Sequence, residues 1–468
     1  MLSTKIICTI GPASDSPEIL EKLAEAGMNI ARLNFSHGTH TSHKKIIKQI
    51  HELNRSGQFP IAIMLDTQGP EIRTGNETSD LMSKEIVTVS CPPFKENEGN
   101  IHVNYSALKG DLKPGNYISI DSGLVKLKVL GKHKKGLKCE VIDGGIVNGH
   151  RHVNLPGTVV KLPGITKADK RDILFGMKQK VNFIALSFVR SSETIREVRE
   201  LLGKHASHTE IIAKVENQEG VERLEEIVQE ADGVMVARGD LGIEVELEDV
   251  PQIQRRIAFL CAKYGKRSIV ATHMLESMIE HPVPTRAEVT DVANAIFEES
   301  DAIMLSGETS IGNYPVRSVE TLKRIAKRTE IFPGVNFSKN LIMEKDGQHI
   351  AASAIQIASD LKIRAAVVIT RNGRGARYLS NLRPHGVIIY SFTENAEVLT
   401  SNLMYRGVYP FLLKLKKNPE DTIQDALKIL KKTGKFSSEE KVIVLANILT
   451  GEGYNTSLQI RTIPAGKK

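Results

Sequence analysis

The chain has 468 residues, of which 41% are apolar and 25% are charged, a balance typical of globular proteins. Its length predicts about three domains, and no apolar run approaches the ~18 residues of a membrane helix. The net charge of +8 comes from dispersed basic residues, and only 5% of residues are aromatic, none of them tryptophan. This pattern argues against nucleic-acid binding and suits phosphorylated small molecules.

The four cysteines, Cys8, Cys91, Cys139 and Cys261, are scattered and form no CxxC pair. Their spacing argues against a disulfide framework or a thiolate zinc site and favours a reducing compartment. The opening segment MLSTKIICTIGP lacks a charged-then-apolar leader with a cleavage site. We therefore expect a cytoplasmic protein that does not contact a membrane.

Apolar, β-rich runs alternate with helical patterns over residues 1–69 and again over 157–332. Eight strands are expected in these regions: 5–10, 28–35, 61–66, 181–189, 210–216, 233–237, 268–274 and 301–307. Amphipathic helical patterns follow them, for example at 16–27, 218–232 and 284–299. The last helix begins with a capping box of Thr285 and Glu288. Eight strand–helix units in sequence predict an α/β fold of the (β/α)8 TIM barrel type, with a doubly wound sheet as the alternative.

The helical pattern is absent between residues 70 and 156. Short apolar runs occur there at 85–90, 116–120 and 124–130. KPGN and DGG are turn signals in the same region. We expect a small β-barrel domain over 70–156, inserted after the third strand, where it can close over the site as a lid.

A further α/β segment follows over residues 333–468, with strands expected at 365–370, 386–392 and 441–448. Its notable loop is TRNGRGARY, at 370–378, which lies between a strand and a helix. Such a loop suits an anion at a helix N-terminus, and an arginine-rich surface turn is the alternative.

The carboxyl ends of barrel strands form the rim where chemistry takes place. Lys214 and Glu216 are two residues apart at one strand end and so share a face, and Asp240 follows the next strand in ARGDLG. Two carboxylates and an ammonium suit a divalent metal with a phosphate-bearing substrate. A surface ion pair is the alternative for Lys214 and Glu216 alone.

Other strand ends add polar groups: Arg32, Asn34, Ser36, His37, Asp66, Thr67, Glu71, Arg73, Thr272, Ser306 and Glu308. The Asn, Ser, Asp and Thr oxygens of the second and third strand ends could cage a monovalent cation, although these residue types are also common in turns. Arg32 and Arg73 match phosphate oxygens, and each alone could equally be a salt-bridge partner. His37 by itself is more typical of a structural or surface histidine.

Segments of this sequence, in this order, closely resemble the pyruvate kinase family: TKIICTIGPAS (4–14), MNIARLNFSHG (28–38), LDTQGPEIRTG (65–75), VNLPG (153–157), KVENQEG (214–220), MVARGDLG (235–242), ATHMLESM (271–278), PTRAEVTDVANA (284–295) and MLSGET (304–309). The resemblance is dense from residue 4 to about 330 and weaker beyond. It implies a TIM barrel, an inserted β-barrel lid domain and a C-terminal α/β domain for effectors and oligomerisation. It also implies the final step of glycolysis, in which phosphoenolpyruvate passes its phosphoryl group to ADP and gives pyruvate and ATP.

The resemblance implies roles for the groups at the strand ends. Glu216 and Asp240 would hold Mg²⁺ or Mn²⁺, and the K⁺ ligands would be Asn34, Ser36, Asp66 and Thr67, with Glu71 going with K⁺ dependence. The substrate would contact Arg32, Lys214, Ala237, Arg238, Gly239, Asp240 and Thr272. The nucleotide would contact Asn34, Ser36, His37, Arg73 and Arg151. Catalysis would fall to Lys214 and Arg32 for the phosphoryl group and to Thr272 and Ser306 for a proton relay.

The sequence departs from the family pattern near the nucleotide and substrate positions. Gln68 stands where the family usually has Lys, Arg151-His152 where it has Lys-Gly, and His273 where it has Gln. These departures leave nucleotide affinity and pH dependence open. In the C-terminal segment the resemblance implies a homotetramer and an effector site for a sugar phosphate or AMP, with candidate residues Thr370, Asn372 and Arg374.

Two other classes of function would share these residues. A metal-dependent lyase or aldolase of the same barrel type would use the Mg²⁺ site without ADP or K⁺. A regulatory pseudo-enzyme or a basic RNA-binding protein would not be catalytic. The intact charges at 214, 216 and 240 oppose the pseudo-enzyme, and the absence of aromatic-basic clusters opposes RNA binding.

Overall fold

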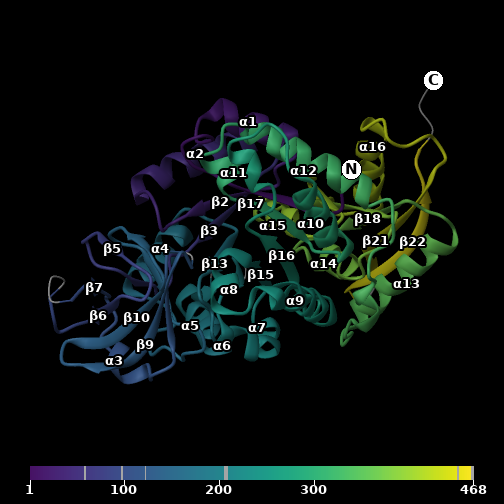
Figure 1. The fold of residues 1–468 in the computed structure, drawn as a ribbon. Coiled ribbons are helices and arrows are strands. Elements are labelled where there is room, and N and C mark those ends of the chain that lie inside the picture. The colour runs from purple at the N-terminus through teal and green to yellow at the C-terminus, as the bar shows by residue number, and fades with distance from the viewer. Residues whose placement is uncertain (57–58, 96–98, 122, 205–208, 451–452, 465–468) are drawn as a thin grey trace.

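The computed structural model describes residues 1–56, 59–95, 99–121, 123–204, 209–450 and 453–464 (Figure 1). Residues 465–468 of the expected third domain lie outside them. The centre of the molecule is a closed barrel of parallel strands in the order β1-β17-β16-β15-β14-β13-β3-β2. All eight expected barrel strands are confirmed: β1 Lys5–Thr9, β2 Ile30–Asn34, β3 Ala62–Asp66, β13 Phe183–Leu186, β14 Glu210–Val215, β15 Gly233–Ala237, β16 Arg267–Ala271 and β17 Ala302–Leu305.

These strands are buried on both faces, which explains their nearly continuous apolar sequences. Along β3, Ala62 and Met64 belong to the cluster that fills the barrel, whereas Ile63 and Leu65 pack with residues of the surrounding helices. Alternate residues of a strand therefore serve two separate layers of the core. The middle of the barrel strands is mostly apolar, with Arg32 of β2 an exception, so most polar side chains lie at the strand ends.

A ring of helices covers the barrel: α1 Pro17–Ala26, α2 His40–Ser56, α4 Lys167–Lys178, α5 Ser192–Leu202, α6 Gln218–Glu222, α7 Leu224–Glu230, α9 Val250–Tyr264, α10 Arg286–Phe297 and α12 Pro315–Thr329, with the short α8 Arg238–Glu244 and α11 Gly307–Ser310. The capping box of Thr285 and Glu288 is confirmed at the start of α10. Within the described residues, no helix combines the length and apolar composition needed to cross a bilayer.

The single helix expected over 218–232 is wrong. The chain leaves the helical conformation at Arg223, where φ is −95° and ψ is 19°, so that α6 and α7 are separate. Arg223 forms ion pairs with Glu193 of α5 and Glu226 of α7, at 3.2 and 2.8 Å. The pair with Glu193 is a tertiary contact and the pair with Glu226 is local, and both lie where the amphipathic pattern itself gives no sign of a break.

A separate β domain is inserted between β3 and α4, as expected (Figure 1). Its main sheet runs β4-β12-β8-β9-β10-β6-β7, and β5 pairs with β11. The two ends of the main sheet meet at a bridge between Thr74 and Val103, so the sheet curls toward a barrel. Its elements are β4 Ile72–Arg73, β5 Ser79–Leu81, β6 Ile86–Ser90, β7 Ile101–His102, α3 Leu108–Asp111, β8 Tyr117–Ile120, β9 Val125–His133, β10 Gly136–Asp143, β11 Gly145–Val147 and β12 His152–Asn154.

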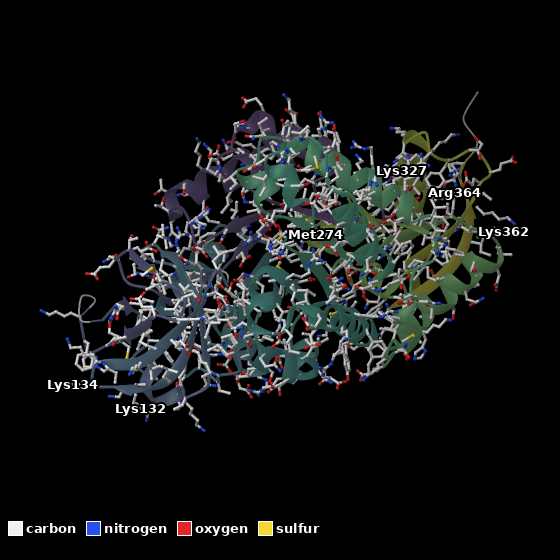
Figure 2. The ribbon with its side chains drawn as sticks, viewed as in Figure 1. Lys132, Lys134, Met274, Lys327, Lys362 and Arg364 are labelled. Atoms are coloured by element: carbon white, nitrogen blue, oxygen red, sulfur yellow. The ribbon has the colours of Figure 1, made fainter. Side chains whose placement is uncertain are left out.

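Basic side chains are spread over the molecule rather than gathered at one place. Lys132 and Lys134 lie at the far end of the inserted domain, whereas Lys327, Lys362 and Arg364 lie toward the opposite end of the molecule (Figure 2).

The C-terminal domain has a five-stranded sheet in the order β20-β19-β18-β21-β22, in which only β22 is antiparallel to its neighbour. The three expected strands are confirmed, and two edge strands were missed. Val408–Leu412 contains Pro410, which is typical of edge strands and weakens the strand signal, and Gly453–Thr462 is largely polar. The elements are α13 Asp346–Asp360, β18 Ala365–Ile369, α14 Arg374–Asn381, β19 Ile388–Thr393, α15 Ala396–Ser401, β20 Val408–Leu412, α16 Pro419–Lys432, β21 Lys441–Thr450 and β22 Gly453–Thr462.

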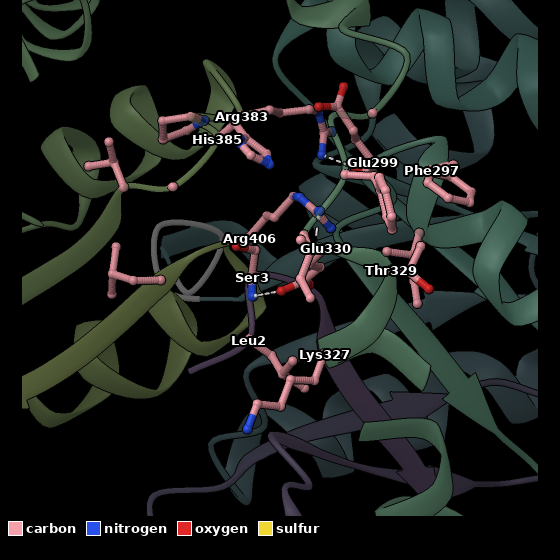
Figure 3. A pocket seen from close by; sticks show the side chains of 18 of the residues that line it. Leu2, Ser3, Phe297, Glu299, Lys327, Thr329, Glu330, Arg383, His385 and Arg406 are labelled. Atoms are coloured by element: carbon pink, nitrogen blue, oxygen red, sulfur yellow. Dashed lines mark hydrogen bonds and ion pairs between the residues drawn. The ribbon is translucent and has the colours of Figure 1, made fainter. Parts of the chain in front are cut away.

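The amino ends of the barrel strands rest on the C-terminal domain through buried charged groups. Arg383 lies 2.8 Å from Asp301, and Arg267 donates to Asn381 at 2.7 Å while stacking 4.2 Å from the Tyr405 ring. A cavity of about 230 Å³ lies at this junction, between the start of the chain, the barrel and the C-terminal domain (Figure 3). It is at the end of the barrel opposite the carboxyl ends of the strands.

Lys5, at the start of β1, is buried at the same junction, 2% exposed. Its ammonium donates to the carbonyl of Val408 and lies 4.5 Å from the centroid of the Tyr409 ring. Burial lowers the pKa of Lys5 to about 7; Glu330 opposes the shift and Arg406 adds to it. The charged form is therefore less stable in the folded protein than in the unfolded chain.

We expect Lys5→Met to change how stability depends on pH. Below pH 7 both states hold the proton, so the parent carries the full cost of a buried ammonium. Between pH 7 and about 10 the unfolded chain binds more protons than the folded protein, and the parent gains stability relative to the variant by up to about 1.4 kcal/mol per pH unit. Thermal unfolding of both proteins from pH 6 to 9 measures this. The exposed Lys22→Met on α1 is the control, and parallel curves for parent and Lys5→Met would contradict the expectation.

Candidate active site

The carboxylate of Asp66 lies between two cationic side chains at the carboxyl ends of the strands. Asp66 ends β3 and is 0% exposed. Arg32 of β2 donates to one of its oxygens at 2.6 Å, and Lys214 of β14 donates to the other at 3.1 Å. Burial alone would raise the pKa of Asp66, but Arg32 and Lys214 outweigh it and hold that pKa below its usual value. The carboxylate therefore stays ionised.

Three oxygens surround the Lys214 ammonium. They belong to Ser187 at 2.7 Å, Glu216 at 2.9 Å and Asp66 at 3.1 Å. Burial opposes the charged form, yet the two carboxylates raise the pKa of Lys214 above its ordinary value. A fully charged ammonium is thus held at the barrel rim.

Glu216 follows directly after β14 and is 0% exposed. One oxygen accepts the backbone N–H of Phe188 at 2.7 Å, and the other lies at ion-pair distance from Lys214 without hydrogen-bond geometry. Burial raises the pKa of Glu216 to about 7; Lys214 opposes the shift and nearby Asp240 adds to it. A buried carboxylate oxygen in this condition has the capacity to bind a cation.

Asp240 lies in the first turn of α8, which begins as soon as β15 ends at Ala237. Residues 238–242 of the ARGDLG segment are therefore helical. The Asp240 side chain is 38% exposed, and its nearest basic group is His152 of the inserted domain, at 3.8 Å. The site thus has one buried and one open carboxylate, and the open one faces the inserted domain.

The turn after β16 is tied to the start of α8. Thr272 has a φ of 67°, which is strained for a β-branched residue. Its hydroxyl accepts the N–H of Gly239 at 2.8 Å, and its carbonyl accepts Arg238 at 2.6 Å. Arg238 also pairs with Asp291 of α10 at 2.7 Å. These bonds hold the strained turn and bring Thr272 beside Gly239.

Ser306 follows β17 and precedes α11. Its N–H donates to Glu308 at 2.7 Å, whereas its buried hydroxyl oxygen has no hydrogen-bond partner in the described part of the protein. Glu308 also accepts the N–H of Leu275 in the loop after β16, and burial raises its pKa. The eighth strand end is thereby linked to the seventh.

The candidate cation-cage residues lie on adjacent strand ends. Asn34 is the register partner of Asp66 between β2 and β3, and its side-chain oxygen accepts the N–H of Ser36 at 3.1 Å. The hydroxyl of Thr67 accepts the N–H of Ser187 at 3.2 Å. His37 is exposed, and its carbonyl accepts a ring N–H of His43 at 2.9 Å.

Two of the candidate nucleotide contacts come from the inserted domain, where β4 and β12 pair Arg73 with His152. Arg73 lies 2.6 Å from Glu71, which also accepts Gln68 at 3.2 Å. Arg151 is 3.5 Å from Asp121. Gln68 therefore forms a hydrogen bond to Glu71 but carries no charge.

The candidate effector residues lie in the C-terminal domain, far along the chain from the barrel rim. The Thr370 hydroxyl accepts the N–H of Gly373 at 2.9 Å and shapes the loop before α14. Asn372 and Arg374 line a cavity of about 260 Å³ between α14, α15 and the amino ends of β14 and β15. Thr370 supports that loop and is not among the lining residues.

Sequence reasoning missed the end of the fourth barrel strand. After β13, Ser187 bonds to Lys214 through its hydroxyl, and Phe188 bonds to Glu216 through its N–H. The rule that polar residues at strand ends form the site would have identified Ser187 in the segment VNFIALSFV. The contact of His152 with Asp240 depends on how the inserted domain sits and carries no local signal.

Comparisons with known proteins identify the family of the chain. The family model described as pyruvate kinase, barrel domain, matches residues 1–319, and that described as pyruvate kinase, alpha/beta domain, matches residues 348–460. Pyruvate kinases of Staphylococcus aureus strains MRSA252 and USA300 are each 40% identical over 470 aligned residues, covering 98% of this chain and 80% of the relative. Matching models over most of its length and relatives at this identity mean that the chain belongs to the pyruvate kinase family.

Proposed function

We propose that the barrel rim is where this chain carries out its family's reaction. The phosphoryl group of phosphoenolpyruvate passes to ADP and yields pyruvate and ATP, the final step of glycolysis. The observation that carries this assignment is the charged Lys214 ammonium held between Asp66 and Glu216 in a buried site. A preorganised cation of this kind stabilises charge that develops on a phosphoryl group in flight.

Glu216 and Asp240 are the proposed ligands of Mg²⁺ or Mn²⁺. Support comes from the buried oxygen of Glu216 that lacks a hydrogen bond and from the exposed carboxylate of Asp240 near it. In the described residues no cluster of three or more His, Cys, Asp and Glu side chains could hold a metal, so substrate and water would complete the coordination. When bound, the ion neutralises phosphate and enolate oxygens.

The proposed K⁺ ligands are oxygens of Asn34, Ser36, Asp66 and Thr67. Their support is chemical type and adjacency, since Asn34 and Asp66 are register partners at the rim. Asp66 would then be shared between K⁺, Arg32 and Lys214. Asp66 and Glu216 are already paired with the cations Arg32 and Lys214. The positive charge of K⁺ would therefore be matched by the phosphates of the substrates.

The protein's own groups divide the phosphoryl transfer between them. Lys214 and Arg32 neutralise the phosphoryl oxygens while the bond from phosphorus to the enol oxygen breaks and the bond to an ADP oxygen forms. Arg73 and Arg151 of the inserted domain, with Asn34, Ser36 and His37, bind the nucleotide phosphates. Arg73 is paired with Glu71 and Arg151 with Asp121, so substrate phosphates would compete with these carboxylates for the two arginines.

The enolate left behind takes a proton at its methylene carbon. The substrate carboxylate binds at the start of α8, over Ala237 to Asp240, next to Thr272. Thr272 and the unpartnered Ser306 hydroxyl are the proposed members of a proton relay through water. A hydroxyl is too weak an acid to act alone, so water completes the path.

Omitting each cation in turn tests this proposal directly. With phosphoenolpyruvate and ADP, we expect pyruvate formation to stop without Mg²⁺ and to fall by roughly tenfold or more without K⁺, because each neutralises charge in the transition state. A coupled pyruvate assay after desalting measures both. Omitting ADP discriminates a lyase or aldolase, since pyruvate formed without ADP would contradict phosphoryl transfer.

Replacing the rim lysine should abolish activity and also cost stability. Lys214→Met removes the charge that neutralises the phosphoryl group, so we expect kcat to fall by about a thousandfold or more. It also leaves Asp66 and Glu216 short of a partner, which should lower the free energy of unfolding by about 3–5 kcal/mol. Steady-state kinetics and thermal unfolding measure the two effects.

Lys266→Met is the matched control, because Lys266 bonds only to backbone carbonyls at the amino end of β16. It should keep kcat near the parent value. Circular dichroism and Mn²⁺ binding by paramagnetic resonance establish that Lys214→Met remains folded. A folded Lys214→Met with parent-like kcat would rule out the proposed role.

An effector site for a sugar phosphate or AMP is proposed at the cavity lined by Asn372 and Arg374. Arg374 and Arg377 of α14 face this space and would meet a phosphate. Glu210 and Asp232 line its barrel side, and one buried oxygen of Glu210 lacks a hydrogen-bond partner. These carboxylates favour a ligand that also carries hydroxyl or amino donors.

Effector titrations test the site. We expect fructose phosphates, glucose 6-phosphate, ribose 5-phosphate or AMP to shift the half-saturating phosphoenolpyruvate concentration several-fold, and Arg374→Gln to remove the shift. The exposed Lys362→Gln in the same domain controls for the lost charge. A flat response to every compound, at saturating ADP, would end the proposal.

A homotetramer and a cytoplasmic location stay predictions that the family resemblance supports. The four cysteines are all buried and free, which is consistent with a reducing compartment.

A further inference from the structure

Ser187 contacts the Lys214 ammonium and carries no charge itself. Its hydroxyl oxygen lies 2.7 Å from the ammonium, closer than Asp66 at 3.1 Å or Glu216 at 2.9 Å. Ser187 and Asp66 accept hydrogen bonds from the ammonium, and Glu216 lies at ion-pair distance from it. Asp66 and Glu216 are both proposed to hold cations, so Ser187 is the one of these three contacts that is not also a proposed cation ligand.

The orientation of the Ser187 hydroxyl is fixed by a second hydrogen bond. Two acceptors lie in reach of its single proton, the backbone carbonyl of Thr67 at 2.6 Å and the Asp66 carboxylate at 3.4 Å. The nearer carbonyl takes the proton, so the lone pairs face Lys214. Thr67 belongs to the proposed K⁺ cage. One buried hydroxyl, in a residue 4% exposed, therefore connects the rim lysine to the monovalent cation site.

The backbone around Ser187 leaves this side chain little freedom. Its N–H donates to the Thr67 hydroxyl at 3.2 Å, and Gly69 packs against it from the loop after β3. A Cβ atom on Gly69 would come within 2.8 Å of the Ser187 Cβ, and the φ of Gly69 is +76°. The loops after β3 and β13 are thus in close contact, and this packing keeps the Ser187 hydroxyl in place.

We propose that Ser187 is a positioning residue, which aims the Lys214 ammonium at the phosphoryl group and couples it to the K⁺ site through the Thr67 carbonyl. The inference rests on the proposed function of the same site. It predicts that removing the hydroxyl affects turnover and cation dependence together, and nucleotide affinity little.

Ser187→Ala tests the proposal with K⁺ titrated at saturating phosphoenolpyruvate and Mg²⁺. We expect kcat to fall by about tenfold or more, as for loss of a hydrogen bond to a charged group. The half-saturating K⁺ concentration should rise several-fold, both in the kinetics and in the K⁺-dependent increase of the thermal unfolding temperature without substrates, while the KM for ADP stays within about twofold. A merely structural role would lower the amount of active enzyme and leave the K⁺ dependence unchanged.

Ser318→Ala is the matched control, because Ser318 is fully buried on α12 and its hydroxyl donates to the Tyr314 carbonyl at 2.9 Å. It should behave as the parent. If Ser187→Ala does not fold, Ser187→Cys fills the same space, and its thiol is a poor acceptor for the ammonium, so the same pattern is expected.

The inference is overturned if the parent is active and K⁺-dependent but the folded Ser187 variant keeps the parent's kcat or its half-saturating K⁺ concentration. That result leaves the proposed function intact. A parent that makes no pyruvate from phosphoenolpyruvate and ADP overturns the proposed function, and the inference with it.

Discussion

The fully buried carboxylate of Asp66 is the constraint on which the rim depends. It is shared by Arg32 and Lys214, and Lys214 is shared in turn with Glu216, so the four groups form one chain of ion pairs in a largely buried site. Removing one member of such a group leaves a buried charge without compensation, at a cost of about 3–5 kcal/mol. The ends of β2, β3 and β14 are therefore held in one arrangement before any ligand arrives, which is what electrostatic preorganisation requires.

The rest of the site divides into a rigid half and an open half. On the rigid side, the loop after β13 holds Glu216 through the Phe188 N–H and Lys214 through the Ser187 hydroxyl. On the open side, Asp240 is part exposed and meets the inserted domain only at 3.8 Å, through His152. The groups paired within the barrel are thus held more tightly than the carboxylate that faces the inserted domain.

The sequence allowed the barrel to be predicted because its parallel strands are buried on both faces and stand out as continuous apolar runs. The same signal fails at sheet edges, where Pro410 interrupts β20 and polar residues alternate along β22. Lys214, Glu216 and Asp240 could be selected because strand ends and helix starts put them on one rim. The break at Arg223 and the approach of His152 could not, because each depends on partners distant in sequence and on the way separate units pack.

Two buried lysines show why burial alone does not identify a functional group. Lys5 at the amino end of the barrel and Lys214 at the carboxyl end are both nearly inaccessible. Lys5 meets a carbonyl and an aromatic ring, so burial dominates and lowers its pKa; Lys214 meets two carboxylates, and its pKa is raised instead. Lys5 makes a structural contact between domains, and its positive charge lowers stability there. Lys214 stays positively charged. The two lysines differ in the charge of their partners. The carboxylates around Lys214 lie at the ends of barrel strands, where polar residues are compatible with an apolar barrel interior.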